Sequence, residues 1–217
     1  MPIISPSTND GVISFTTGIS WTLARDASSG TAILSTGGSA PFGIRSRKVS
    51  SGRGTQYVVS RTFMQFSTSD ISGAPASANL NIYGVHGTTA NFFVVQSTQT
   101  SPLISADFDA ISGFVSGNND RTVYKYSSKI ESWSTSGYNT IPLNATALKN
   151  MGTLSTLKMC LIEADYDLTD TEPSTGTDVF SGVYFIEWVN SYERPYLDYT
   201  PATVAVADNA TFFGANF

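Results

Sequence analysis

The order of apolar and polar residues along the chain predicts a series of short β-strands. Residues 57–66 form a nearly continuous apolar run, YVVSRTFMQF, and a hydroxyl-rich turn sequence follows it. Residues 78–84 alternate instead, which places Ala78, Leu80 and Ile82 on one face and two asparagines and a tyrosine on the other. The first pattern predicts a central strand, and the second predicts a strand with one buried face.

Other stretches rich in β-branched and aromatic residues continue this pattern along the chain. Further strands are expected at residues 21–26, 92–96, 157–162, 183–189 and 195–199, with short edge strands near 32–34 and 42–44. The sequence contains no tandem repeat with a period of 20 to 50 residues, which argues against a solenoid or a propeller. Short strands separated by turn sequences are typical of a β-sandwich.

Two short helices are expected between the strands. The first has Ser105 as its N-cap, Asp107 in its first turn and Gly113 as its stop. The second has Asn144 as its N-cap and ends at Gly152. Both are short enough to cross the ends of a sandwich.

The two ends of the chain differ from its middle. Residues 1–20 are rich in turn formers and hydroxyls and predict an N-terminal arm, whereas residues 21–200 predict the β-sandwich domain. Residues 201–217 predict a C-terminal arm, in which an alternating Thr-Val-Ala-Val-Ala sequence precedes three phenylalanines. An exposed segment of this kind is unfavourable in water, so we expect its phenylalanines to form part of an interface. They are Phe212, Phe213 and Phe217.

Composition supports an all-β fold. Only 13% of the 217 residues are charged, and the chain contains 30 Ser, 26 Thr, 18 Gly and 9 Pro, so hydroxyl-bearing strands and turns supply most of its polarity. No apolar run is long enough to cross a bilayer. We therefore expect a jelly-roll-like antiparallel β-sandwich with one or two short helices and extended terminal arms.

Charge is distributed unevenly along the chain. A net charge of −5 argues against a nucleic-acid partner, because phosphate contacts need an excess of clustered cations. One segment is nevertheless basic, and we interpret it as a subunit interface that meets an acidic loop of a neighbour; a solvated surface and a nucleic-acid site are the alternatives. The basic residues are Arg45, Arg47, Lys48, Arg53 and Arg61.

The acidic counterpart lies between residues 163 and 178, where six acids occur without a Lys or Arg. Oxygen-rich loops bind calcium in some β-sandwiches, so Asp165, Asp167 and Asp170 are candidate calcium ligands. The spacing is not that of an EF-hand loop. A solvated acidic loop, or one that faces a basic partner, explains the same composition.

Catalytic residue types are scarce. His86 is the only histidine and Cys160 the only cysteine, so a Ser-His-Asp arrangement would have to use His86. We expect His86 to lie on the surface and Cys160 to be buried in a strand as a small apolar residue. No catalytic residue, zinc site or disulfide is therefore expected, and the protein is not expected to be an enzyme.

Sugar rings stack on exposed aromatic side chains, so the aromatic residues expected on the surface are candidates for sugar binding and the buried ones are not. Trp21, Trp133 and Trp188 lie in or beside expected strands, and core packing is the expectation for each. Tyr138 lies in a Ser-Gly-Asn-rich stretch and is the better candidate for an exposed ring.

Four segments are similar to a known family. Residues 60–73, SRTFMQFSTSDISG, and 76–83, ASANLNIY, resemble the core of DNRLRE-type jelly-roll domains, in which a strand with Arg and aromatic residues, a turn and an Ala-Leu strand follow one another. Residues 133–148 and 193–200 are similar to the second half of such domains. The Arg-Asp-Ala sequence that begins at Arg25 also resembles structural proteins of tailed bacteriophages.

The resemblance implies a component of the virion, such as a capsid decoration (cement) protein or a tail or fibre accessory. Its partners would be other copies of itself and other virion proteins, without a nucleic acid or a membrane. The start of the chain lacks the basic and apolar regions of a signal peptide, so synthesis in the host cytoplasm is expected. A carbohydrate-binding module for host glycans is the alternative, although the chain lacks the tryptophan-rich segment of the sugar-binding members.

Overall fold

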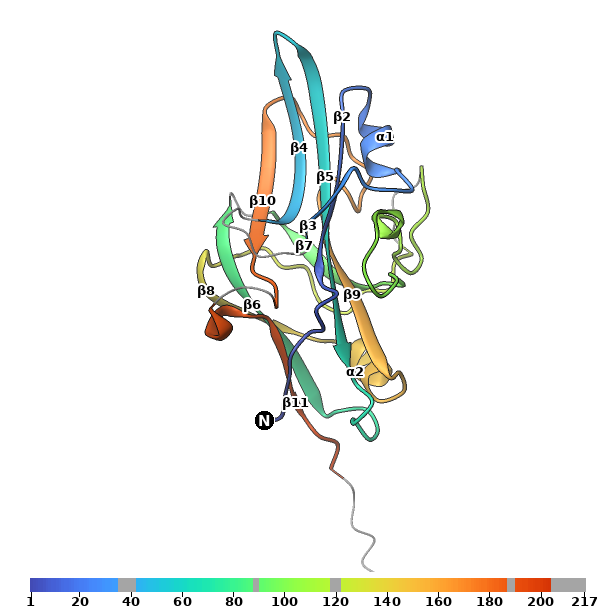
Figure 1. Ribbon diagram of the computed structural model, residues 1–217, viewed down its shortest axis with the longest axis vertical. Coiled ribbons are helices and arrows are strands. Elements are labelled where there is room, and N and C mark those ends of the chain that lie inside the picture. Colours follow the sequence, from blue (N-terminus) through green and yellow to red (C-terminus); the bar gives the residue numbers. More distant parts are fainter. Residues whose placement is uncertain (35–41, 88–89, 118–121, 187–189, 204–217) are drawn as a thin grey trace, which may run out of the picture.

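One long strand belongs to both β-layers of the molecule (Figure 1). This strand, β5 (Gly54–Ser67), pairs along one edge first with β4 (Phe42–Ser51) and then with β9 (Thr156–Glu163). Its other edge pairs with β2 (Gly11–Thr17). The sheet therefore divides at β5 into two layers. The computed structural model describes residues 1–34, 42–87, 90–117, 122–186 and 190–203.

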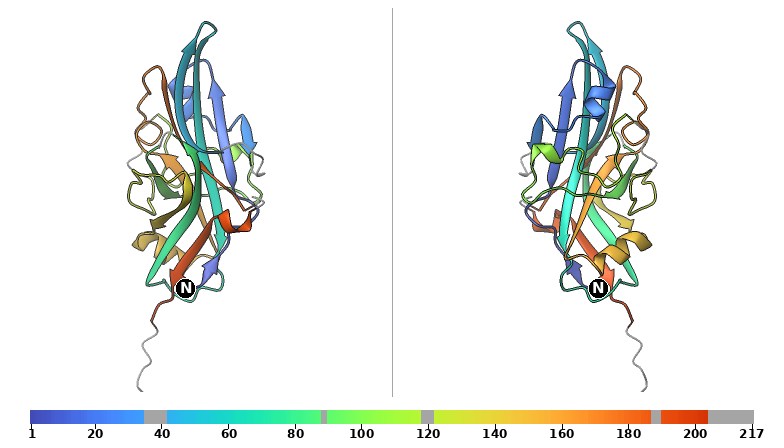
Figure 2. Two further views of the ribbon diagram at one scale, coloured as in Figure 1. Left: turned by 90° about the vertical axis from the view of Figure 1, so that its left-hand side faces the viewer. Right: turned by 90° about the vertical axis from the view of Figure 1, so that its right-hand side faces the viewer.

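The layers continue on either side of this branch point, as the side views in Figure 2 show. The inner layer extends from β9 to β7 (Phe92–Gln96). The outer layer extends from β4 to β10 (Thr177–Val183) and then to β6 (Ser77–Gly87), which β8 (Ser136–Pro142) and β11 (Tyr196–Thr200) flank. All these pairs are antiparallel, and the expected all-β antiparallel sandwich is confirmed. The remaining elements are β1 (Ile3–Ile4), α1 (Trp21–Arg25), β3 (Ala32–Leu34), α2 (Ala145–Met151) and the 3₁₀ turns η1 (Ser105–Asp107) and η2 (Ser191–Glu193).

Apolar side chains fill both sides of the inner layer. Met64, Leu80 and Met159 belong to a core between the two layers. On the far face of the inner layer, Phe63 and Cys160 belong to a second core, which α1 and neighbouring loops cover. A strand covered on both faces needs apolar residues at nearly every position. This double burial explains the continuous run at residues 57–66 and confirms the central strand predicted there.

The alternating segment behaves as predicted. Ala78, Leu80 and Ile82 of β6 point into the core between the layers, whereas Asn79 and Tyr83 are half-buried on the outer face. The outer layer is therefore covered on one face only, and its sequence alternates.

The start of the chain is not an arm, in contrast to the expectation for residues 1–20. β2 lies within the sheet between β5 and β3, and β1 pairs with β11. Val12 and Ile13 are buried in the two cores. Ser and Thr occupy much of β2 because its outward positions face hydroxyls of β5, as in the Ser14–Ser60 hydrogen bond of 2.8 Å. These hydroxyls gave the strand the composition of a turn.

Two other local predictions were wrong. Residues 21–25 form α1 instead of a strand, because the Ser20 side chain accepts a hydrogen bond from the Leu23 N–H and caps the helix. Of the strand expected at 183–189, only Val183 belongs to a strand among the described residues, since β10 (Thr177–Val183) ends there, and residues 187–189 lie outside the described residues. β8 was not predicted.

The expected helices have different outcomes. At α2 the Asn144 side chain accepts from the N–H groups of Thr146 and Ala147, and Gly152 is the C-cap, as predicted. The first helix is only the 3₁₀ turn η1, which follows Ile104 and not a Ser105 cap.

A buried charge joins β5 to the loops that cover the second core. The Arg61 side chain is fully buried, and its Nε and Nη2 donate to the two carboxylate oxygens of Asp167 at 2.9 and 2.7 Å. Nη1 donates to the Phe108 carbonyl and Nη2 to the Arg25 carbonyl, both at 2.9 Å. The Phe108 and Phe114 ring centres lie 4.3 and 4.4 Å from Cζ. Burial disfavours the charged guanidinium, but the Asp167 carboxylate outweighs it and raises the pKa of Arg61.

Arg25 extends this buried network to the end of α1. Its Nε donates to the Asp167 carbonyl at 2.8 Å, and its Nη1 donates to Asp26 at 2.6 Å. The other Asp26 oxygen accepts from the Gly117 N–H at 2.7 Å. The network therefore ties α1, β5 and two covering loops together.

Removal of the Asp167 charge should destabilise the fold strongly. Asp167→Asn leaves Arg61 buried without a counter-ion, which costs about 3–5 kcal/mol of unfolding free energy. Glu172→Gln in the same loop is the matched control, because Glu172 pairs with Lys48 at the surface and should cost at most about 1 kcal/mol. Urea unfolding followed by tryptophan fluorescence measures both; equal costs would contradict this role of Asp167.

Candidate functional site

The carboxylates of the acidic segment lie beside cations of the same chain. Asp167 binds Arg61, and Asp170 lies 3.8 Å from Arg25. Asp165 accepts hydrogen bonds from Lys129 and from the Asn91 side chain, at 2.7 and 2.6 Å. Across the described ranges, no three His, Cys, Asp or Glu side chains gather closely enough to hold a metal ion. Asp165, Asp167 and Asp170, the predicted calcium ligands, instead neutralise cations of the same chain.

The basic segment meets this acidic segment within one chain, and the predicted contact with a neighbouring copy stays a prediction. Lys48 donates to Glu172 at 2.6 Å, and Arg45 forms two hydrogen bonds with Asp178 at 2.7 and 2.5 Å. Arg47 Nε lies 3.5 Å from the same Asp178 carboxylate. The hydrogen bond from Lys48 lowers the pKa of Glu172. Sequence separation hid these pairs, because β10 returns beside β4 only in the folded chain.

Alternation along β4 divides its cations between two faces. Lys48 points toward Tyr57 and Glu172, with Nζ 5.6 Å from the Tyr57 ring centre. Arg45 and Arg47 point to the opposite, outer face, where they are 33% and 30% exposed. The predicted interface residues therefore lie on two sides of the sheet.

The outer face of β2, β5, β4 and β10 carries what we call the arginine face. It comprises two adjoining hollows of about 370 and 540 Å³, which share Thr16, Arg47 and Gln56. Arg45 lines the first hollow, and Arg53 lines the second beside the β4–β5 turn. Three cations and one nearby carboxylate, Asp178, leave this face with a positive balance. The full lining is Val12, Ser14, Thr16, Thr17, Gly18, Gly43, Arg45, Arg47, Val49, Ser51, Arg53, Gly54, Thr55, Gln56, Val58, Ser60 and Phe180.

The outer layer presents aromatic rings farther along the same face. The Tyr83 ring packs edge-on against Tyr138 at 5.4 Å and stacks with Tyr184 at 5.8 Å. Tyr138 also packs edge-on against Tyr196 at 5.2 Å. We call these four tyrosines the tyrosine face.

A hollow of about 440 Å³ borders the tyrosine face. Tyr138, Tyr192 and Tyr196 line it together with Arg194. Tyr192 is 71% exposed, whereas the hydroxyl of Tyr138 lies 2.7 Å from the Tyr192 carbonyl oxygen and holds this loop in place. The prediction singled out Tyr138, but Tyr192 is the more exposed ring.

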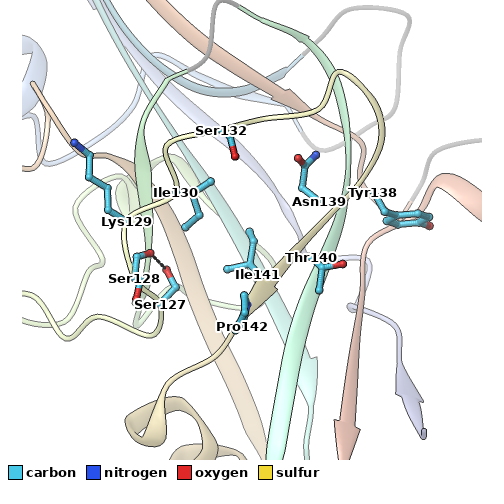
Figure 3. A pocket seen from close by; sticks show the side chains of 10 residues that line it. All are labelled: Ser127, Ser128, Lys129, Ile130, Ser132, Tyr138, Asn139, Thr140, Ile141 and Pro142. Atoms are coloured by element: carbon cyan, nitrogen blue, oxygen red, sulfur yellow. Dashed lines mark hydrogen bonds between the residues drawn. The ribbon is translucent and has the colours of Figure 1, made fainter.

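Tyr138 also lines a groove beside the free edge of β8 (Figure 3). The groove has a volume of about 370 Å³, and Ile130 and Ile141 face each other across it. One wall is β8, and the other is the segment of residues 127–132. The remaining lining residues are Ser127, Ser128, Lys129, Ser132, Asn139, Thr140 and Pro142.

The only histidine and the only cysteine have opposite environments. His86 is exposed at the end of β6, and no side chain in the described part of the chain hydrogen-bonds to its ring. Cys160 is fully buried in β9, as predicted, and burial raises the pKa of its thiol well above the ordinary value. A nucleophilic cysteine needs the opposite shift.

Other predicted residues have mixed outcomes. Trp21 and Trp133 are buried, as expected. Trp188, Phe212, Phe213 and Phe217 lie outside the described residues.

Comparison with protein-family models and with curated proteins found no match to this chain. In the described part of the chain, no helix has the length and apolarity required to span a membrane.

Native Cys160 should resist alkylation. Because the thiol is buried and its pKa is raised, iodoacetamide at pH 8 should modify the native protein at least a hundredfold more slowly than the urea-unfolded protein. Mass spectrometry of the intact chain measures the rate. Modification at equal rates would show that β9 is accessible in the native state.

Proposed function

We propose that this protein is a structural component of a tailed bacteriophage virion, as a capsid decoration or a tail or fibre accessory, and that it acts through protein–protein contacts. The sequence resemblance supplies the virion context. The arginine face is the observation that supports a contact role: four strands present a hollowed surface with an excess of cations on a chain whose net charge is −5.

The chemistry of the arginine face suits an acidic protein surface. Arg45 and Arg47 lie on β4 and Arg53 in the turn that follows it, and hydroxyls of Ser14, Thr16 and Ser60 line the same hollows. Planar guanidinium groups bind carboxylates through two parallel hydrogen bonds, which adds orientation to attraction. Copies of this chain and other virion proteins with acidic surfaces are the proposed partners.

Virion membership can be tested directly. Antibodies raised against the purified chain should label intact particles of the virus that encodes it, in electron micrographs and in immunoblots of purified particles. Absence of the chain from purified particles would overturn the virion proposal.

Loss of one arginine should weaken particle association. Arg47→Ala removes a cation from the arginine face and should reduce binding to particles by about tenfold, with an effect that shrinks as salt rises. Lys48→Ala is the matched control, because it removes the same charge one residue away on the opposite face of the sheet. Co-sedimentation with particles measures both variants, and equal binding would exclude the arginine face as the contact.

The tyrosine face favours a second candidate function, recognition of a host glycan. Aromatic rings at the edge of a hollow, with polar groups beside them, offer the apolar and hydrogen-bonding contacts that a sugar ring requires. Tyr192 is the ring best placed for stacking, and Arg194 and Ser191 contribute polar groups to the same hollow.

Glycan binding should depend on Tyr192. If an array of host polysaccharides identifies a bound glycan, Tyr192→Ala should weaken its binding at least tenfold by isothermal titration calorimetry. Tyr124→Ala is the control, because Tyr124 is 58% exposed but lines none of the hollows described above. No binding to any polysaccharide on the array, or equal binding by the two variants, would count against this function.

A further inference from the structure

We propose that the free edge of β8 accepts residues 202–207 from a second copy of this chain as an added β-strand. The inference rests on the proposed assembly function and names a contact separate from the arginine face. It follows from the register of β8, the groove beside that strand and the sequence that leaves β11.

The register of β8 leaves backbone groups without a strand partner. Ile141 pairs with Leu80, and the Leu143 N–H donates to the Ala78 carbonyl at 2.9 Å. Antiparallel pairs alternate between residues that bond across the pair and residues that point away. Tyr138 and Thr140 therefore direct their backbone N–H and C=O groups away from β6, toward the groove. Among the described strands, β8 pairs only with β6.

The opposite wall of the groove belongs to the inner layer. Ile130 exchanges two backbone hydrogen bonds with Phe92 of β7, at 2.8 and 3.1 Å. The groove thus lies where the edges of the two layers face each other, with Ile130 and Ile141 on its two sides (Figure 3). An added strand would pair with β8 and cover Ile130, which is only partly buried, whereas Ile141 already belongs to the core.

The C-terminal sequence fits this groove in side-chain size. Residues 202–207 read ATVAVA, in which Val204 and Val206 share one face of an extended chain and Ala205 and Ala207 the other. The valines would face Ile130 and Ile141. A volume of about 370 Å³ admits small side chains such as these.

The position of the chain end favours a second copy as the donor. Residues 201–203 continue past the end of β11, away from the body of the molecule (Figure 1). Thr200 pairs with Ser77 and Pro142 with Asn79, so the chain leaves β11 beyond the end of β8 and on the opposite edge of β6 from the groove. Residues 201–217 span roughly 55 Å when extended, which is enough to reach a neighbouring molecule.

Amide exchange on the full chain tests the added strand. The N–H groups of Tyr138 and Thr140 should exchange at least tenfold more slowly at high protein concentration than at high dilution, in parallel with an oligomer detected by light scattering. Exchange that is fast at every concentration would overturn the proposal. Protection that does not change with dilution would show that the chain fills its own groove, which also overturns the second copy as donor.

Two pairs of variants locate the contact. Thr140→Pro removes the outward N–H together with the hydroxyl that donates to Asn81 of β6, and should abolish the oligomer. Thr140→Val removes the same hydroxyl but keeps the N–H, and should retain the oligomer. Val204→Lys with Val206→Lys should abolish it as well, whereas Ala205→Lys with Ala207→Lys should not. Equal behaviour within either pair would contradict the proposed strand.

The two proposals can fail separately. Arg47→Ala should leave the protection of Tyr138 and Thr140 unchanged, because the arginine face is lined by other residues. If particle binding is lost while the Tyr138 and Thr140 amides stay protected, only the arginine face is affected. If the amides lose protection while particle binding is kept, only the β8 contact is affected.

Discussion

The ion pair between Arg61 and Asp167 is the interaction on which the rest of the structure depends. A guanidinium group inside a β-sandwich is costly unless every donor has a partner. Here two carboxylate oxygens, two backbone carbonyls and two phenylalanine rings surround it. These partners come from α1 and from two loops distant in sequence, so the charge can be buried only when all of them are in place. The pair therefore makes the covering of the second core a single cooperative event.

With those loops in place, the inner layer has no exposed face. The outer layer alone presents a broad sheet surface, and both candidate contacts lie on it. The arginine face occupies the end where β4 and β5 project, and the tyrosine face lies where β6 carries β8 and β11. Tyr184 connects the two regions, because its N–H donates to Tyr83 just after β10. One continuous surface thus changes from basic to aromatic along its length.

Sheet edges impose the remaining constraint, since an open edge can pair with another chain. The edge of β7 that does not pair with β9 is bridged by Ile130 and Lys125. The edge of β8 is only partly blocked. Pro142 has no N–H to offer a partner, but Tyr138 and Thr140 keep their outward N–H groups. A short, partly blocked edge of this kind restricts pairing to a strand of limited length and defined register.

The sequence by itself determined the fold class and the strands whose patterns reflect burial. The continuous run at residues 57–66 reflects a strand covered on two faces, and the alternation at 78–84 reflects a strand covered on one. The helix cap at Asn144 could be predicted because it depends only on neighbouring residues. Prediction from the sequence failed at β2, because the hydroxyls that pair across strands resemble a turn sequence. It also failed at α1, where one capping serine makes residues 21–25 a helix instead of a strand. Only the tertiary structure determined which charged residues pair with one another. Composition gave one basic and one acidic segment, but the return of β10 beside β4 made them partners, and the packing of the 163–178 segment on β5 turned Asp167 from a metal candidate into the counter-ion of Arg61. Pairing between residues more than a hundred positions apart depends on the path of the chain, which no local pattern contains.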